Sequence, residues 1–481
     1  MSVWIMDLSA LDPDDVPVTL RFADGEYIDA DHHYYDLRLQ QSVLFINQAF
    51  SGAVLQGSRS GYGQAVLVNT DGGLNYLADY AVDGRDLSIS LVDDGTITQY
   101  VRGTVQKLVF DGTLIRIILR DPQAIIDEVH PLDVYAGDNV LPAGLEGTTN
   151  DIKGSKKPKV FGKVRAAAPI LVNTSKLIYQ VSSLDADIIA VYDRGAALTS
   201  GTDYVTLSEM QAVAPASGEY RAFQGYFRVG SAPAGTITCD VDSPAGAGQV
   251  FTQIAGERSI AVSVGDMAAA DAVGEVGLYV QEDLTTAALL DSIATSIGFY
   301  WFFDVAGVIR LIELAAPTTI THVLNDYEDL EFSRSATGAG SNGLPVYQVR
   351  ILADKVQEVQ TDLAGSVPAE NVARLASQYR EVKFTNAAVK TRHPLSEELV
   401  IESCLRHLAD AQAVADRLGA LLSVRRDRLQ VTARVTTRVD IGQGVLVNVK
   451  RLLYSPLGRP TVVLGQTYDG KRRRVTLDLW G

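Results

Sequence analysis

The sequence predicts a mainly β, multidomain protein of the α+β class, with only a few short helices. Segments in which apolar and polar residues alternate occur near both ends of the chain, as strands with one solvent-exposed face require. Helical periodicity is confined to a few isolated segments. The length of 481 residues exceeds what one hydrophobic core supports, so several packed units are expected.

Composition and charge narrow the class of protein. The chain is 47% hydrophobic and 21% charged, which is typical of a globular protein and excludes a disordered or fibrous one. Its net charge of −16 argues against a nucleic-acid binder, because the average field repels phosphate.

The two cysteines, Cys239 and Cys404, exclude a disulfide framework, a four-cysteine zinc site and an all-cysteine iron–sulfur site. Their sparsity fits folding in a reducing compartment. The N-terminal segment is acidic and its first basic residue is Arg21, so no secretory signal is expected. The longest apolar stretches are strand-sized, and we expect a soluble protein without a membrane helix.

Residues 1–132 are predicted to form a β-rich domain. Segments 107–110 and 113–119 flank Asp111-Gly112, and Asp-Gly supplies the positive φ angles of a type I′ hairpin turn. The alternation of a half-exposed strand is visible at Leu87, Ile89 and Leu91. One short helix is predicted from the helical spacing of Leu74, Leu77, Ala78 and Ala81, with Gly84 as its C-terminal cap.

Residues 133–250 are predicted to form a middle β domain with linkers. Residues 133–165 are rich in Gly, Pro, Thr and Lys and indicate a crossover, after which strands are expected at residues 170–172 and 188–192. The Gly, Ala, Ser and Pro content of residues 231–250 predicts a long surface loop or linker.

Residues 251–335 are predicted to form a helix–hairpin α+β domain. Leu289, Ile293 and Ile297 share one helical face, and Gly298 ends that helix. Residues 299–303 and 308–312 then form two strands around a turn at residues 304–307.

Residues 336–481 are predicted to form a C-terminal helix-plus-β domain. A linker at residues 335–345 leads into it, and a strand at residues 346–351 follows that linker. One apolar helical stripe is made by Leu408, Ala411, Val414, Ala415, Leu418, Leu421 and Leu422. Strands follow at residues 429–435 and 475–479, where apolar and polar residues alternate. The chain thus ends in β-structure, as it began, so its C-terminal part can complete the N-terminal unit, with the middle domains inserted.

Two segments have the spacing of known catalytic or binding loops. Residues 465–472 match a phosphate-binding loop, but Arg472 replaces the required hydroxyl and a strand follows, so a hairpin turn at Asp469-Gly470 is the better interpretation. Residues 339–343 resemble a hydrolase nucleophile elbow around Ser341, but they lie in a linker instead of between a strand and a helix.

Metal-ligating and basic side chains also form local groups. Asp29, Asp31, His32, His33 and Asp36 carry suitable ligand atoms, but adjacent histidines point to opposite faces of a strand, so a solvated strand edge is expected. The basic run at residues 471–474 is interpreted as a solvated turn or as a contact with an acidic neighbour. The sequence therefore assigns no catalytic, cofactor-binding or metal-binding residue, and no cofactor.

Three sets of segments, in this order, resemble the baseplate hub or tail-tip proteins of long-tailed bacteriophages and related gene transfer agents. The first is residues 69–85, NTDGGLNYLADYAVDGR. The second combines residues 157–165, KPKVFGKVR, with residues 178–181, IYQV, and residues 191–195, VYDRG. The third combines Asp410-Ala411 with residues 440–445, DIGQGV, and residues 475–481, VTLDLWG. The third set departs from the family pattern at Gln443-Gly444, where Gly-Asp is expected.

This resemblance implies a non-enzymatic structural protein with β-barrel-like hub domains. Such hubs form a homotrimeric ring under the tail tube and adapt its sixfold symmetry to threefold. They contact a distal tail ring protein, surround the end of the tape-measure protein and hold a central fibre or tip. The resemblance further implies a location in the virion baseplate, synthesis in the host bacterial cytoplasm and no membrane contact in the assembled state. DNA would pass through the channel without specific binding, which suits an acidic surface.

Two other functions stay open at the sequence level. A receptor- or glycan-binding tail protein is suggested by the β-rich composition and by tyrosines and tryptophans in linkers. A cell-wall-degrading tail enzyme is the second, although no pair of carboxylates can be singled out among 58 acidic residues.

Overall fold

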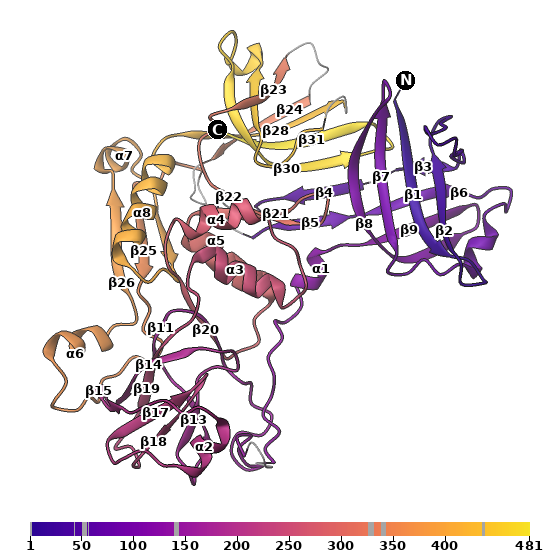
Figure 1. Ribbon diagram of the computed structural model, residues 1–481. Helices are drawn as coiled ribbons and strands as arrows, with labels where there is room; N and C mark the ends of the chain where they lie inside the picture. The colour runs from indigo at the N-terminus through magenta and orange to yellow at the C-terminus, as the bar shows by residue number, and fades with distance from the viewer. Residues whose placement is uncertain are drawn as a thin grey trace.

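A computed structural model describes residues 2–42, 44–50, 55, 57–138, 144–325, 331–337, 343–434 and 438–481. The molecule is mainly β with short helices and several separate sheets, which confirms the predicted fold class. Figure 1 shows the sheets of the two chain ends side by side, the middle β unit at the opposite end, and a layer of helices between them.

The N-terminal sheet has seven strands in the order β2-β1-β7-β8-β9-β6-β3. Its strands are β1 (Val3–Leu11), β2 (Pro17–Ala23), β3 (Leu39–Gln41), β6 (Gln64–Val68), β7 (Asp86–Asp93), β8 (Thr96–Asp111) and β9 (Leu114–Arg120). Asp36, just before β3, forms a parallel bridge with Phe22 in β2, at the opposite edge. The sheet therefore curves until its two edges approach each other, although β2 and β3 do not pair as neighbouring strands.

The predicted hairpin at residues 107–119 is present as β8–β9, but its turn lies one residue further along. Asp111 pairs with Leu114, so the two-residue loop is Gly112-Thr113. Only Gly112 has a positive φ there, 56°, which fits the first central position of a type II′ turn. The expected type I′ assignment is wrong because cross-strand register, which is not local, decides which residues are central.

The helix predicted around Leu74 is a short 3-10 helix, η1 (Asn75–Asp79), and Tyr80 follows it as the cap. Gly84 does have a positive φ, 69°, but it lies beyond the helix and does not cap it. A five-residue helix with one buried side chain, Leu77, has too little apolar surface to hold a longer α-helix.

The C-terminal sheet takes two strands from the N-terminal part of the chain. Its order is β23-β29-β30-β31-β28-β24, and β4 pairs with both β30 and β5. The strands are β4 (Leu44–Gln48), β5 (Arg59–Tyr62), β23 (Ile320–Asn325), β24 (Glu331–Thr337), β28 (Arg426–Arg434), β29 (Gly444–Asn448), β30 (Arg459–Asp469) and β31 (Arg474–Trp480). The predicted alternation is confirmed in β28 and β31, where every second side chain is buried.

An aromatic cluster joins the two large sheets. Tyr468 in β30 packs edge-on against Tyr100 in β8, with ring centroids 4.9 Å apart. Tyr468 also stacks on Phe45 in β4 at 6.4 Å, and Tyr100 packs edge-on against Trp4 in β1 at 5.0 Å. All four rings are buried. We call this contact the aromatic junction.

The middle β unit holds two facing sheets. One has the order β11-β19-β14-β15 and the other β12-β13-β18-β17-β16, with the pair β10-β20 beside them. Bounds are β10 (Lys159–Gly162), β11 (Val164–Ala167), β12 (Ile170–Asn173), β13 (Ile178–Gln180), β14 (Asp187–Asp193), β15 (Ala196–Ala197), β16 (Thr199–Ser200), β17 (Glu219–Phe223), β18 (Tyr226–Val229), β19 (Ile237–Asp242), β20 (Gly277–Val280), and the helix α2 (Leu207–Ala212).

The prediction of a surface loop at residues 231–250 is wrong. β19 is an inner strand of its sheet, and Cys239 and Val241 are fully buried in it. The helix α3 (Ala247–Gly256) then begins inside the same stretch. Gly248 in this helix allows α4 to pack closely against it, because a Cβ at Gly248 would lie 2.0 Å from the carbonyl oxygen of Met267 in α4. Small residues therefore mark a close helix–helix approach here and not a linker.

The central helices carry the predicted helix and hairpin. They are α3, α4 (Val264–Asp271) and α5 (Thr286–Ser296), followed by the hairpin β21 (Phe299–Phe303) and β22 (Ile309–Glu313). The helix at residues 289–297, its end at Gly298 and the hairpin are confirmed. The short helix α1 (Gln123–Ile126) leads out of the N-terminal sheet.

An α/β unit precedes the last strands. Its sheet has the order β26-β25-β27, and the predicted apolar stripe forms the helix α8 (Leu408–Leu422), which packs on β25 and β26. The unit comprises β25 (Gln348–Ala353), β26 (Arg380–Thr385), β27 (Glu398–Glu402), α6 (Ala369–Leu375) and α7 (Ala387–Arg392), and the 3-10 helix η2 (Lys450–Leu452) lies after β29. The predicted linker at residues 335–345 is wrong at its start, because residues 335–337 belong to β24 and pair with β28.

In the described part of the chain, the buried side chains form one large core, a second core in the middle β unit and two smaller clusters, one at that unit and one at the N-terminal sheet. The large core runs from the N-terminal sheet through α3, α5 and α8 to the C-terminal sheet. The second core lies between the facing sheets of the middle unit and includes Phe227 and Val191. The bounds of the four predicted domains stay predictions.

Candidate functional site

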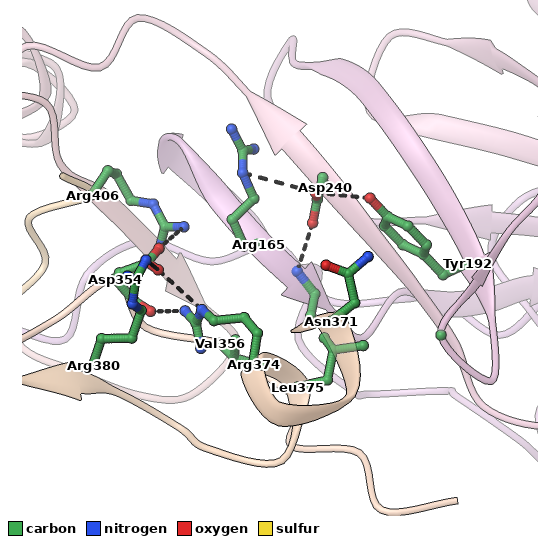
Figure 2. Close-up of a pocket in the computed structure, with 12 residues that line it drawn as sticks. Arg165, Tyr192, Asp240, Asp354, Val356, Asn371, Arg374, Leu375, Arg380 and Arg406 are labelled. Carbon is green, nitrogen blue, oxygen red and sulfur yellow. Dashed lines mark hydrogen bonds and ion pairs between the residues drawn. The ribbon is translucent and has the colours of Figure 1, made fainter. Parts of the chain in front are cut away.

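A pocket of about 310 Å³ lies where the middle β unit meets the α/β unit. Figure 2 shows side chains from the middle unit on one side and from the segments around β25, α6 and β26 on the other. We call it the arginine pocket because four of its lining residues are Arg165, Arg374, Arg380 and Arg406, against the two carboxylates of Asp240 and Asp354.

The backbone segment of residues 354–360, which we call the strap, connects these two sides of the pocket. The chain turns at Asp354, directly after β25, with a positive φ of 52° that aspartate tolerates better than most residues. The strap then runs along β11, where the amide of Gln357 donates to the carbonyl of Arg165 at 3.1 Å and that of Glu358 to Ala166 at 3.0 Å. Gln360 anchors its far end through a buried hydrogen bond to Thr238, at 2.9 Å.

Asp354 is shared by several guanidinium groups. Arg406 donates to its Oδ1 at 2.7 Å and Arg374 to its Oδ2 at 3.0 Å. Arg380 stands further off, with 3.6 Å between its Nη1 and Oδ2. Arg374 lies in the last turn of α6, a position that the helix dipole favours for a cation.

The other wall of the pocket is held by Asp240 in β19. Its carboxylate accepts the amide hydrogen of Ala166 at 2.9 Å and the phenol of Tyr192 at 3.1 Å. Arg165 is 3.8 Å from it and donates instead to Asp242 at 2.7 Å. Figure 2 shows Asp240 between Arg165 and Tyr192.

Burial governs the protonation of these groups. Desolvation raises the pKa of Asp240, and it raises the pKa of the Tyr192 phenol, which remains a donor. Desolvation also lowers the pKa of Arg406, with Arg165 and Arg374 adding repulsion and Asp354 opposing it. The arrangement suits the binding of an anion better than bond-making chemistry.

The side chains with metal-ligating atoms at residues 29–36 do not gather around one point. Asp29 accepts from the amide and ring of His33, with 2.9 Å between Oδ2 and Nδ1, whereas His32 lies in a turn with a φ of 65°. The segment is a turn and not the strand edge that was expected, because Asp29 closes it with bonds to the amides of Asp31 and His33. In the described part of the chain, no group of three or more His, Cys, Asp or Glu is placed to hold a metal ion.

Residues 465–472 form the end of β30 and a hairpin turn, as expected, with no helix after them. Within the basic run, Arg473 donates to Asp24 at 3.0 Å and Arg474 to Glu331 at 2.7 Å, which confirms contact with acidic neighbours. Residues 339–342 of the elbow-like segment, including Ser341, lie outside the described residues. Both cysteines are free and buried.

In residues 69–85, the first segment that resembles tail proteins, side-chain hydrogen bonds hold the turn. Asn69 accepts the amide of Leu74 at 2.8 Å and donates to Asn75 at 2.8 Å, while Gly72 has a φ of 72°. Asp71 accepts both terminal nitrogens of Arg38, at 2.7 and 2.8 Å. The Asn-x-Asp-Gly pattern therefore has a structural role, closing a turn beside the N-terminal sheet.

Sequence reasoning missed the arginine pocket as a site. Arg165 and Tyr192 lie in the segments that resemble tail proteins, but no signal marked them as neighbours of Arg406 or Asp354. The lining residues span positions 165 to 406, and each of the charged ones alone is an ordinary surface residue type.

Among the described residues, none of the helices combines the length and the apolar character that crossing a bilayer requires.

Comparisons with known proteins give structural likenesses only. No family model matches the sequence, and neither does any curated protein. The chain is similar to the 43 kDa tail protein of prophage MuSo2 from Shewanella oneidensis, with 10% identity, a TM-score of 0.42 and coverage of 100% of this chain and 98% of that one. It is also similar to a tail protein from Neisseria meningitidis MC58, with 9% identity, a TM-score of 0.44 and coverage of 99% and 96%.

A third likeness is to a chain of a native gene transfer agent particle, at 14% identity, a TM-score of 0.43 and coverage of 69% of this chain and 85% of that one. At these identities and TM-scores, the likenesses do not determine what this chain does.

Proposed function

We propose that this chain is a structural baseplate hub or tail-tip protein of a phage-like tail. Three copies form a ring under the tail tube, adapt its sixfold symmetry to threefold, surround the end of the tape-measure protein and anchor a central fibre. The ring also meets a distal tail ring protein. The protein acts through its surfaces and makes or breaks no covalent bond.

The observation that carries this proposal is the pair of large sheets at the two ends of the chain. The seven-stranded and the C-terminal sheet lie side by side and are fixed by the aromatic junction. The strand β4, which comes from the N-terminal part of the chain, pairs with β30 in the C-terminal sheet. Three copies of a chain with two such sheets present six sheets around one axis. That number matches a sixfold tube while the ring itself keeps threefold symmetry.

The charge of the chain supports the same role. A net charge of −16 gives an average field that repels DNA, as a channel that passes DNA without binding it requires. Closed rings use heterologous contacts, in which different patches of neighbouring copies meet. Exposed apolar side chains available for such contacts include Leu453 and Leu457 in the loop between β29 and β30.

The alternative of glycan binding loses part of its basis. The tryptophans Trp4, Trp301 and Trp480 are all buried, so none of them offers a stacking surface for sugars. Binding of the isolated protein to intact host cells would favour that alternative, and release of soluble fragments from cell walls would favour a lytic enzyme.

The proposal is tested on particles that contain this chain. We expect cryo-electron microscopy to place it on the tail axis at the end of the tube, and quantitative mass spectrometry to count three copies per particle. A position away from the axis, or a copy number that is not three, would contradict the proposal. A stable trimer of the purified protein by light scattering would support it further.

A further inference from the structure

We propose that the arginine pocket is a binding site for a small oxyanion, such as phosphate or a dicarboxylate. This inference is independent of the hub assignment. It rests on the charge balance, the available donors and the position of the pocket.

The charge balance of the pocket is opposite to that of the chain. Four guanidinium groups line it against two carboxylates, whereas the chain as a whole has a net charge of −16. Asp242, which accepts from Arg165 but does not line the pocket, reduces the surplus to one positive charge. This local positive surplus attracts an anion into the pocket.

Two of the arginines keep donors available. Within the described residues, Arg380 approaches only Asp354, at 3.6 Å, and its side chain is 52% exposed. Arg165 donates from one terminal nitrogen, Nη1, to Asp242, and its Nε lies 3.8 Å from Oδ2 of Asp240. A guanidinium carries five N–H donors in a planar fork that matches the oxygens of phosphate and carboxylate groups.

The remaining two arginines supply a fixed positive field. Arg406 is nearly buried and is locked between Asp354 and the carbonyl of Lys355, at 2.7 and 2.9 Å. Because like charges crowd it and solvent is largely excluded, a nearby anion would interact with it more strongly than at an exposed site. The volume of about 310 Å³ has room for phosphate and part of its hydration shell.

Occupation of the pocket would tie the two units together. Arg165 belongs to β11 of the middle unit, and Arg380 begins β26 of the α/β unit. An anion held by both replaces repulsion across the junction with attraction from each side. A ligand that binds the folded state alone raises the free energy of unfolding by mass action.

Isothermal titration calorimetry with inorganic phosphate, and separately with succinate, tests the site at constant ionic strength. We expect one anion per chain, with one of the two probes preferred. Arg380→Gln should weaken binding about tenfold or more, since a hydrogen bond to a charged group contributes ~1.5–3 kcal/mol. Arg392→Gln, an equal change of charge on exposed α7, is the matched control and should bind as the parent chain does.

A second readout separates binding from folding. The melting temperature should rise with the preferred anion in the parent chain and in Arg392→Gln, and less in Arg380→Gln. The melting temperature without ligand should be nearly equal in all three, because Arg380 is half exposed. Absence of binding heat for both probes at millimolar concentrations, or equal binding in Arg380→Gln and Arg392→Gln, would overturn the proposal.

Discussion

The aromatic junction and the arginine pocket join parts of the same chain by opposite means. The first packs four buried rings between the two large sheets, and the second holds the middle unit with shared carboxylates and guanidiniums. Apolar packing depends neither on the ionisation of its groups nor on the screening of charges, whereas buried ion pairs are stable only while every partner is present. The contrast indicates a rigid contact between the sheets and a contact that responds to its ionic surroundings at the middle unit.

The largest effect is expected at the aromatic junction. Tyr468→Ala removes the ring that contacts both Tyr100 and Phe45, and should lower the free energy of unfolding by about 4 kcal/mol. Tyr468→Phe keeps the ring and loses only the 3.3 Å hydrogen bonds with the backbone of Val439. This substitution should therefore lower the free energy of unfolding by about 1 kcal/mol. Denaturant unfolding of both variants measures the difference. Similar losses in the two variants would show that the ring packing does not dominate.

At the arginine pocket, Asp354→Ala should lower the free energy of unfolding by about 3 kcal/mol, because it leaves Arg406 buried without its carboxylate. Glu358→Ala, which removes an exposed carboxylate from the same strap, is the control and should change it by less than about 0.5 kcal/mol. Unfolding in urea, which leaves ionic strength unchanged, compares them. An equal effect of the two substitutions would mean that Asp354 is not the centre of this contact.

Asp291 combines the two kinds of contact, because it is an ionisable carboxyl group that is largely removed from solvent and lies against the buried Trp301. In α5 it accepts only the indole N–H of Trp301, at 2.7 Å, among the described residues, and desolvation raises its pKa to about 6. A carboxyl whose pKa is raised by folding stabilises the protein at low pH, and this contribution is lost as the pH rises through about 6.

Asp291→Asn should therefore raise the free energy of unfolding by about 2 kcal/mol at pH ~8 and change it little at pH ~4. The amide oxygen of asparagine keeps the bond to Trp301. Urea unfolding at the two pH values measures the effect. A gain of the same size at both pH values would show that ionisation of Asp291 is not its cause.

The smallest effect is expected where the basic turn touches the N-terminal sheet. Arg473 and Asp24 form a partly exposed ion pair at 3.0 Å, so Arg473→Ala should lower the free energy of unfolding by about 0.5 kcal/mol. High salt should abolish this difference, since exposed pairs are screened. A loss that persists in molar salt would instead assign the role to packing of the side-chain stem.

The alternating strand β31 and the helix α8 were predicted from the sequence, but the pairing partners of the strands at the aromatic junction were not. Alternation in β31 and the apolar stripe of α8 follow from burial on one face, which leaves a local period in the sequence. The pairing of β4 with β30 joins residues more than 400 positions apart, and no local period reports it. The inner strand β19 was misread for the same reason, since its neighbours β11 and β14 supply the burial.

For the candidate site, sequence reasoning identified segments and not contacts. Arg165 and Tyr192 lie in segments that resemble tail proteins. Contact with an acidic neighbour was one of the two interpretations of the basic run at residues 471–474, and Arg473 and Arg474 make such contacts. Sequence reasoning gave no basis for grouping Asp354, Arg380 and Arg406, because their meeting depends on the strap after β25 and on its turn at Asp354.

By itself, the sequence determined the mainly β class, the central helix and hairpin, the helix α8 and the alternating C-terminal strands, because each of these depends on residues a few positions apart. Only the tertiary structure decided the order of strands in the sheets, the shift of the turn at Gly112 and the convergence of four arginines on one pocket. The physical reason is range: periodicity records which face of a segment is buried, whereas sheet register and charge clusters depend on which distant segment buries it.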